Sequence, residues 1–222
     1  MKKIILSLLL VISLFAVTAC ATKESKAFKE DYEKLNGQTN SSGKIHRTVK
    51  IDEDNPFIEV TAEEIVKKIE NKETFYVYFG STLCPWCRSA IEKAIEVAKK
   101  NNIKTIYYVD IWDENGKEIL RDKYELQDNN LVRIQNGTDT YYKLLDYFDN
   151  VLSDYNLTNE NDEKIATGEK RIYAPNYIYI KDGKAIKLVE GTSDNQKDAR
   201  EELTKELLDD EEKIFNDFFN TK

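Results

Sequence analysis

The stretch from residue 75 to residue 88 constrains the fold of this chain more than any other. It opens with an apolar run of aromatic and β-branched residues, Phe75 to Phe79, which is typical of a buried strand. After Gly80 comes Cys84-Pro85-Trp86-Cys87, and the apolar spacing of a helix begins at once. The sequence therefore predicts a strand, a short loop and a Cys-x-x-Cys pair at the start of a helix.

The position of these cysteines at a helix start has a chemical consequence. Backbone N–H groups in the first helical turn lack partners, and the positive end of the helix dipole lies there. Both effects stabilise a thiolate, so we expect Cys84 to be the exposed nucleophile with a lowered pKa. Cys87 is expected to be half buried one turn further on, close enough to close a disulfide. The pattern predicts a thiol–disulfide exchange site.

The N-terminus has the pattern of an export signal. A short basic start precedes a nearly unbroken apolar run, Ile4 to Val17, which is too short for a spanning helix. The residues up to Cys20 resemble a bacterial lipobox, in which the cysteine is lipidated. We therefore expect residues 1–19 to be a signal peptide and Cys20 to anchor the chain to the extracytoplasmic face of the bacterial cell membrane. An ordinary cleaved signal or a transmembrane anchor is the alternative.

Residue counts narrow the possible functions of the chain. It has 222 residues and three cysteines, and once Cys20 is assigned to lipid, Cys84 and Cys87 are expected to act as a pair. The formal net charge is −8 and there is no basic stripe, which argues against nucleic acid as a partner. A metal site would need ligands beside the two cysteines, and the single histidine, His46, lies away from them in sequence, so no metal is expected.

The order of elements predicts one α/β domain after a flexible tether. Residues 20–45 are polar and contain several turn-forming residues, so they are expected to be the tether, and residues 46–222 the domain. Thr61 and Glu64 fit a capping box at a helix start. Strand, helix and strand in succession predict a right-handed parallel unit. The expected strands are 57–60, 74–79, 104–111, 176–180 and 185–189, and the expected helices are 61–71, 85–100 and 194–219.

The stretch from about 112 to 170 differs from the rest and is expected to be a mainly helical insertion. Apolar residues within 119–126 suggest one short helix, and those within 141–152 suggest a second. Residues 131–134 look extended, and the polar residues 156–170 are expected to form a loop.

From about residue 57 to residue 219 the chain resembles the thioredoxin family. The resemblance is carried by Cys84-Pro85-Trp86-Cys87 after a buried strand, Val109-Asp110 at the end of the next strand, and Tyr173-Ala174-Pro175 before a hairpin. It implies a thioredoxin fold, a mixed central sheet flanked by helices, with the insertion placed before the strand that follows a cis-proline. With its signal, the chain resembles membrane-anchored thioredoxin-like lipoproteins, some of which are labelled bacteriocin transport accessory proteins.

The same resemblance assigns roles to residues around the dithiol. Cys84 and Cys87 are the catalytic pair. Pro175 is expected to be cis, and the backbone of Ala174 to pair with a substrate chain. Trp86 is either a platform for a substrate peptide or a residue that packs against the insertion.

Three further residues are expected to tune the site. Pro85 occupies a helix start, where its missing N–H costs little. Arg88 is either a cation that lowers the pKa of Cys84 or an exposed side chain. Tyr78 stands where thioredoxins carry a buried acid, and Leu83 stands where they carry tryptophan, so the chain is expected to be a specialised member.

The expected function is that of an extracytoplasmic thiol–disulfide oxidoreductase acting on protein thiols or disulfides. It needs no cofactor beyond the Cys84–Cys87 disulfide, and a membrane protein is one candidate redox partner. Oxidase, isomerase and reductase directions remain open. The alternative is a non-enzymatic thioredoxin-fold module that binds partners or assists peptide export.

Overall fold

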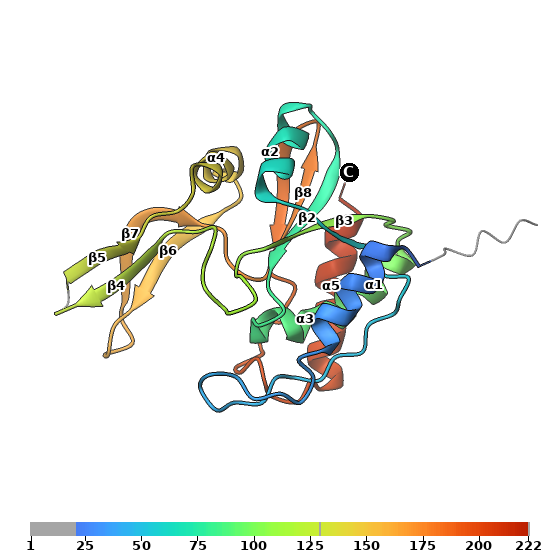
Figure 1. Cartoon of the computed structure of the whole chain (residues 1–222), viewed down its shortest axis with the longest axis horizontal. Helices are drawn as coiled ribbons and strands as arrows, with labels where there is room; N and C mark the ends of the chain where they lie inside the picture. Colours follow the sequence, from blue (N-terminus) through green and yellow to red (C-terminus); the bar gives the residue numbers. More distant parts are fainter. Residues whose placement is uncertain (1–20, 129, 222) are drawn as a thin grey trace, which may run out of the picture.

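A five-stranded mixed sheet forms the centre of the protein (Figure 1). The computed structural model of the chain describes residues 21–128 and 130–221. Three neighbouring strands are parallel, and the last two form an antiparallel hairpin at one edge. Across the sheet the order is β1 (Phe57–Glu59), β3 (Ile106–Asp110), β2 (Phe75–Gly80), β8 (Asn176–Lys181) and β9 (Lys184–Val189).

Helices cover both faces of this sheet because its central strands are apolar on both faces. Alternate side chains of β2 point to opposite faces, so Tyr78 and Val77 belong to two different core clusters. The protein is therefore a mixed α/β structure in three layers. On the Tyr78 side lie α1 (Lys23–Glu33), α3 (Pro85–Lys100) and α5 (Lys205–Phe219), and on the other side lie α2 (Ala62–Glu70) and α4 (Asp139–Phe148).

The predicted strands and helices around the sheet are confirmed to within a few residues, apart from the start of the last helix. The capping box of α2 is present: the Thr61 hydroxyl accepts the Glu64 N–H at 3.2 Å, and the Glu64 carboxylate accepts the Thr61 N–H at 2.8 Å. The helix α3 spans the predicted residues 85–100. Asp182 and Gly183 both have positive φ, as a tight turn between β8 and β9 requires.

The prediction of a flexible tether for residues 20–45 is wrong for the part that the structure describes. Residues 23–33 form α1 instead. Its Phe28 ring stacks on Phe57 of β1 with 4.5 Å between centroids, and its Tyr32 is fully buried. The sequence gives only a weak signal for this helix, because it has few apolar residues among many lysines and acidic residues and its apolar face is therefore narrow. The folded domain therefore begins with α1.

The insertion between β3 and β8 consists mainly of strands, so the prediction of a mainly helical insertion is wrong. Residues 123–127 form a strand where a helix is predicted, and residues 153–171 form a hairpin where a loop is predicted. These strands bury few side chains, so apolar and polar residues do not alternate clearly along them in the sequence. The predicted extended segment and second helix are present. The elements are β4 (Lys123–Gln127) paired with β5 (Asn130–Gln135), then α4, then β6 (Ser153–Thr158) paired with β7 (Lys164–Arg171).

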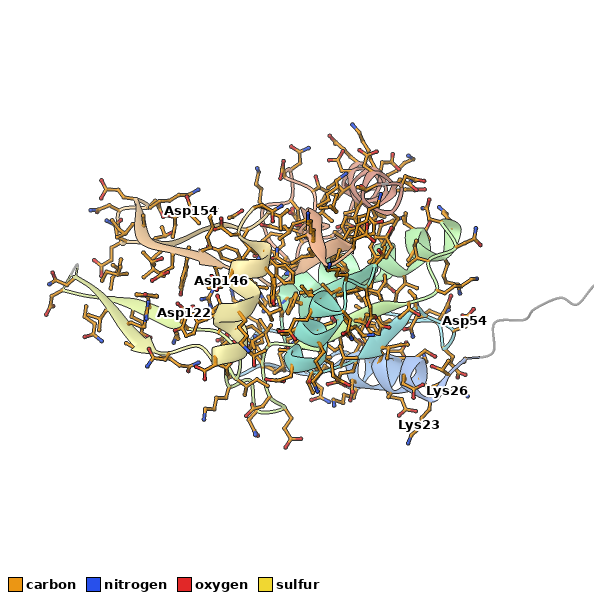
Figure 2. The ribbon with its side chains drawn as sticks, turned by 90° about the horizontal axis from the view of Figure 1, so that it is seen from above. Lys23, Lys26, Asp54, Asp122, Asp146 and Asp154 are labelled. Carbon is orange, nitrogen blue, oxygen red and sulfur yellow. The ribbon has the colours of Figure 1, made fainter. Side chains whose placement is uncertain are left out.

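The β4–β5 and β6–β7 hairpins form an arm that projects from one side of the sheet (Figure 1). Seen from above, Asp154 of this arm and Lys23 of α1 lie on opposite sides of the central sheet (Figure 2). A buried ion pair holds the base of the arm, where the Arg171 guanidinium lies 3.2 Å from the Asp122 carboxylate. The arm is thus fixed at its base rather than joined by a loose linker.

The last helix begins later than predicted. Residues 194–204 are irregular, and α5 starts after Thr204, whose hydroxyl accepts the Leu207 N–H at 3.4 Å. The acidic run 209–212 lies within this continuous helix, and Glu211 in it is fully buried.

Within residues 21–128 and 130–221, no helix is both long enough and apolar enough to cross a membrane. The predicted signal peptide, residues 1–19, and the predicted lipidation site, Cys20, lie outside the described residues.

Candidate dithiol site

Cys84 is the N-cap residue of α3, as the sequence predicts. Its sulfur accepts the Cys87 N–H at 3.4 Å, so it takes one of the backbone donors that lack partners in the first helical turn. Pro85 follows at the first helical position, where its lack of an N–H removes no helical hydrogen bond. Both thiols are free in this structure, which describes the dithiol form.

Both cysteines are buried, so the expectation of an exposed Cys84 and a half-buried Cys87 is wrong. The exposed fraction is 4% for Cys84 and zero for Cys87. The Cys84 thiol donates a hydrogen bond to the carbonyl oxygen of Ala174 at 3.3 Å, on the loop before β8.

The surroundings shift the two thiol pKa values in opposite directions. The pKa of Cys84 is lowered, chiefly by a hydrogen bond from the Cys87 thiol, and burial opposes this shift. Backbone N–H groups of Cys87 and Trp86 and the positive charge of Arg121 lower it further. The pKa of Cys87 is raised well above its ordinary value, first by burial and then by the bond to Cys84. Cys84 is therefore the thiol that ionises first.

Arg88 is neither an exposed side chain nor a main cause of the low Cys84 pKa. It is fully buried, and its guanidinium donates to the carbonyl oxygens of Tyr32 at 2.8 Å and Arg47 at 2.6 Å. It also donates to the Asn36 side chain at 2.7 Å and the Thr82 carbonyl at 3.2 Å. Arg88 thus ties the N-terminal segment to the loop before Cys84.

The cation that acts on Cys84 is Arg121, which lies before the insertion arm and which the sequence reasoning missed. Its guanidinium pairs with Glu118 and donates to the Ile172 carbonyl at 3.0 Å. No local signal marks Arg121, because only the folded insertion brings it beside the dithiol. The spacing of Glu118 and Arg121 in the sequence suits an ion pair, but it does not indicate that Arg121 acts on the dithiol.

Tyr78 lies beneath Cys87, in the place where the family resemblance implies an acid. It is fully buried, and its hydroxyl bonds the Tyr32 hydroxyl at 2.8 Å. Its hydroxyl also hydrogen-bonds the Cys87 thiol, which lowers the pKa of Cys87 against the effect of burial. Its ring stacks on Tyr177 at 4.5 Å and on Tyr108 at 5.3 Å between centroids. We call these four residues, Tyr32, Tyr78, Tyr108 and Tyr177, the tyrosine cluster.

The loop before β8 completes the site, and the Ala174–Pro175 peptide bond is cis, as predicted. A cavity of about 410 Å³ beside it is lined by Trp86, Tyr173, Ala174 and Pro175, and on its other side by residues 190–196. Trp86 is half buried against the core that contains the dithiol and also lines this cavity. Trp86, Ala174 and Pro175 therefore meet at one opening beside Cys84.

No protein-family model matches the chain, and no curated protein is significantly similar to it. Among the described residues no group of three His, Cys, Asp or Glu side chains could hold a metal ion. His46, the first residue after the predicted tether, is buried, and burial together with the charges of Arg88 and Arg200 lowers its pKa. The residues brought together at the site are thus a dithiol, a cis-proline loop, one cation and the tyrosine cluster.

Proposed function

We propose that the chain has the thioredoxin fold and is a thiol–disulfide oxidoreductase that acts on protein thiols or disulfides. The observation that carries this proposal is the geometry of Cys84, the N-cap of α3, whose sulfur accepts the Cys87 N–H at 3.4 Å and whose thiol bonds the Ala174 carbonyl at 3.3 Å. The lowered pKa of Cys84 and the raised pKa of Cys87 agree with it. The strand order β1-β3-β2-β8-β9 supports the fold. The proposed location is the extracytoplasmic face of the membrane, with lipid on Cys20 as the anchor and no cofactor besides the dithiol.

In the first step the Cys84 thiolate attacks a substrate disulfide. A bond forms between Cys84 and one substrate sulfur, and the other substrate sulfur leaves as a thiolate. The cavity beside Trp86 and Pro175 is where the substrate chain would lie, because it is lined by Ala174, whose carbonyl oxygen bonds the Cys84 thiol. The backbone of Ala174 would release the Cys84 thiol and pair with the substrate instead.

In the second step Cys87 resolves the mixed disulfide. Its sulfur attacks Cys84, the Cys84–Cys87 disulfide forms, and the second substrate thiolate is released. The reverse sequence oxidises a substrate dithiol. The high pKa of Cys87 keeps it protonated until this step, which favours attack on the substrate by Cys84 alone.

The second candidate function is a non-enzymatic thioredoxin-fold module for partner binding or peptide export. The observation in its favour is the 4% exposure of Cys84, which suits a dithiol kept for stability. Insulin reduction and ribonuclease oxidation separate the two candidates. An oxidoreductase has at least one of these two activities, and the Cys84→Ser variant loses it. A binding module has neither activity, and its role in cells persists in the Cys84→Ser variant.

The direction of the reaction is tested by the reduction potential of the Cys84–Cys87 pair against glutathione. A value of about −120 mV indicates an oxidase. A value of about −270 mV indicates a reductase, which needs an electron donor such as a membrane redox partner.

A further inference from the structure

The cavity beside the cis-proline loop has two walls, and the proposed chemistry uses only one of them. Trp86, Ala174 and Pro175 line the wall next to the dithiol, and residues within 190–196 line the opposite wall. The Ala174 carbonyl oxygen on the first wall bonds the Cys84 thiol at 3.3 Å. Side chains that flank the reacting cysteine of a substrate would therefore meet the second wall.

The second wall carries two carboxylates, Glu190 and Asp194. Both side chains are exposed and both line the cavity, so they lie at its mouth. Partial burial and then the charge of Asp194 raise the pKa of Glu190, and no cation acts against them. Lys197 approaches Asp194 only at its backbone carbonyl oxygen, at 3.5 Å. The two carboxylates thus repel each other, and neither has an ion-pair partner among the described residues.

A further acceptor in the same wall belongs to Gln196, which lines the cavity and is 6% exposed. Its amide nitrogen donates to the Ser89 hydroxyl at 2.8 Å and to the Asp198 carbonyl at 3.1 Å. Its amide oxygen is buried and has no hydrogen-bond partner among the described residues. A buried acceptor without a donor is costly, so the wall contains acceptor capacity that none of its own donors satisfies.

The hydroxyl donors around the cavity are largely used elsewhere. The Ser193 hydroxyl donates to the Asp210 carboxylate at 2.6 Å, and the Tyr173 hydroxyl donates to the Asp154 carbonyl at 3.1 Å. The described residues that line the cavity include the aromatic rings of Trp86 and Tyr173 but no lysine, arginine or histidine. Carboxylates and aromatic faces both attract cations, so the cavity fits a positively charged side chain that brings its own donors.

The cleft at the end of β3, about 500 Å³ in volume, also has carboxylates, but its own residues partner them. Lys34 lines this cleft and pairs with Asp31 at 2.6 Å. The Glu63 carboxylate accepts the Thr140 hydroxyl at 2.8 Å. The cavity beside Pro175 combines unpaired carboxylates with the Ala174 contact to Cys84, whereas the β3 cleft does not.

We propose that this cavity selects polypeptide substrates with a lysine or arginine next to the reacting cysteine, and that Glu190 and Asp194 recognise the positive charge. This inference rests on the proposed function and names the substrate class of the same site. The cationic head would lie between the two carboxylates, and its aliphatic stem would lie along the Trp86 ring. Recognition therefore speeds formation of the mixed disulfide with Cys84.

The test uses three peptides, acetyl-Gly-Xaa-Cys-Xaa-Gly-amide, in which Xaa is lysine, glutamine or glutamate and the cysteine carries a 2-thiopyridyl group. The Cys84 thiolate of the reduced protein attacks the peptide sulfur, and a bond forms between the two sulfurs. The old disulfide breaks, and 2-thiopyridone leaves with its electron pair and takes a proton from solvent. Its absorbance gives the rate. Each rate is divided by that of the same peptide with 2-mercaptoethanol, which corrects for intrinsic reactivity.

We expect the lysine peptide to react roughly 10-fold faster than the glutamine peptide at low ionic strength, and the glutamate peptide to be slowest. Added salt should shrink this preference, because it depends on charges at the mouth of the cavity. In the double variant Glu190→Gln, Asp194→Asn, the lysine peptide should keep an advantage of at most about twofold.

The matched control is the double variant Glu202→Gln, Glu206→Gln. Both side chains are exposed and neither lines the cavity, so this variant removes the same total charge from another place. Because the chain has a formal net charge of −8, the control separates recognition in the cavity from long-range attraction of any cation. The control should keep the lysine preference of the wild type.

A charge reversal protects the test against a purely structural effect. Glu190→Lys should favour the glutamate peptide over the lysine peptide, a gain that misfolding cannot produce. Equal corrected rates for the lysine and glutamine peptides in the wild type overturn this inference alone, as does a lysine preference that persists in Glu190→Lys or is lost equally in the control. A wild type that releases 2-thiopyridone no faster than Cys84→Ser overturns the proposed function, and this inference with it.

Discussion

The Cys84 thiol donates a hydrogen bond to the carbonyl oxygen of Ala174 at 3.3 Å, across 90 residues of sequence. This contact joins the two halves of the site, one at the start of α3 and one on the cis-proline loop. Under the proposed function, an incoming substrate strand would replace this bond with its own backbone contact to Ala174.

The opposite pKa shifts predict different alkylation of the two thiols. Cys84 should react with iodoacetamide with an apparent pKa below the ordinary thiol value of about 8.5, because a hydrogen bond from the Cys87 thiol, and then the backbone N–H groups of the first helical turn, stabilise its thiolate. Cys87 should react only after unfolding. Mass spectrometry of samples alkylated across a pH series checks both statements. An apparent pKa for Cys84 above the ordinary value would contradict them.

Replacing Gly80, which lies next to the site, with alanine is expected to destabilise the protein. A Cβ at this position would lie 2.2 Å from the Tyr78 ring, so Gly80→Ala must push that ring out of the tyrosine cluster. We expect a loss of roughly 1–3 kcal/mol in the free energy of unfolding, measured with denaturant. Because the clash is with Tyr78, Gly80→Ala should cost much less in a Tyr78→Ala background. An equal loss in the free energy of unfolding in both backgrounds would show that the Tyr78 ring is not the reason why residue 80 must be glycine.

Arg88 predicts that the N-terminal segment is part of the folded domain. Arg88→Ala removes a buried cation that bonds the carbonyls of Tyr32 and Arg47, so it should cost about 3 kcal/mol and speed protease cleavage in the segment 21–50. Lys26→Ala, which breaks only an exposed pair with Glu53, is the control and should change neither. Intact resistance to proteolysis in Arg88→Ala would mean that Arg88 does not hold this segment.

Glu211 predicts a pH-dependent stability with a definite sign. Its folded pKa of about 7 lies above its value of 4.5 in an unfolded chain, so folding favours the protonated form. This contribution is fully present below pH 4.5 and is lost as the pH rises through about 7, by about 3 kcal/mol in all. Denaturant titrations at pH 5 and pH 8 measure it. Glu211→Gln should flatten the dependence, and an unchanged slope in that variant would assign it to other groups.

The sequence predicts the elements whose signals are local. The cap at Thr61, the turn at Asp182 and the apolar spacing of residues 85–100 each determine their own structure, and the structure confirms all three. The cis bond before Pro175 is also confirmed, although that expectation depended on a family resemblance.

The features that the sequence does not predict depend on contacts between distant segments. The sequence of α1 is mostly polar, and only Phe28 and Tyr32 are apolar residues that it buries. The strand β7 buries few side chains. Neither segment therefore shows a clear periodic spacing of apolar residues. No local sequence signal marks the position of Arg121 beside the dithiol or the burial of Glu211, since both depend on neighbours from other elements. The contact of Cys84 with Ala174 likewise joins residues 90 positions apart in sequence.

The central claim, that Cys84 is the nucleophile and Cys87 the resolving thiol, is tested most directly by trapping. Cys87→Ser protein is incubated with a disulfide-bonded protein substrate and resolved on a non-reducing gel, with Cys84→Ser and the double variant as controls. We predict a reducible mixed disulfide with Cys87→Ser and none with the two controls. A trapped complex with Cys84→Ser, or none with Cys87→Ser, would contradict the account.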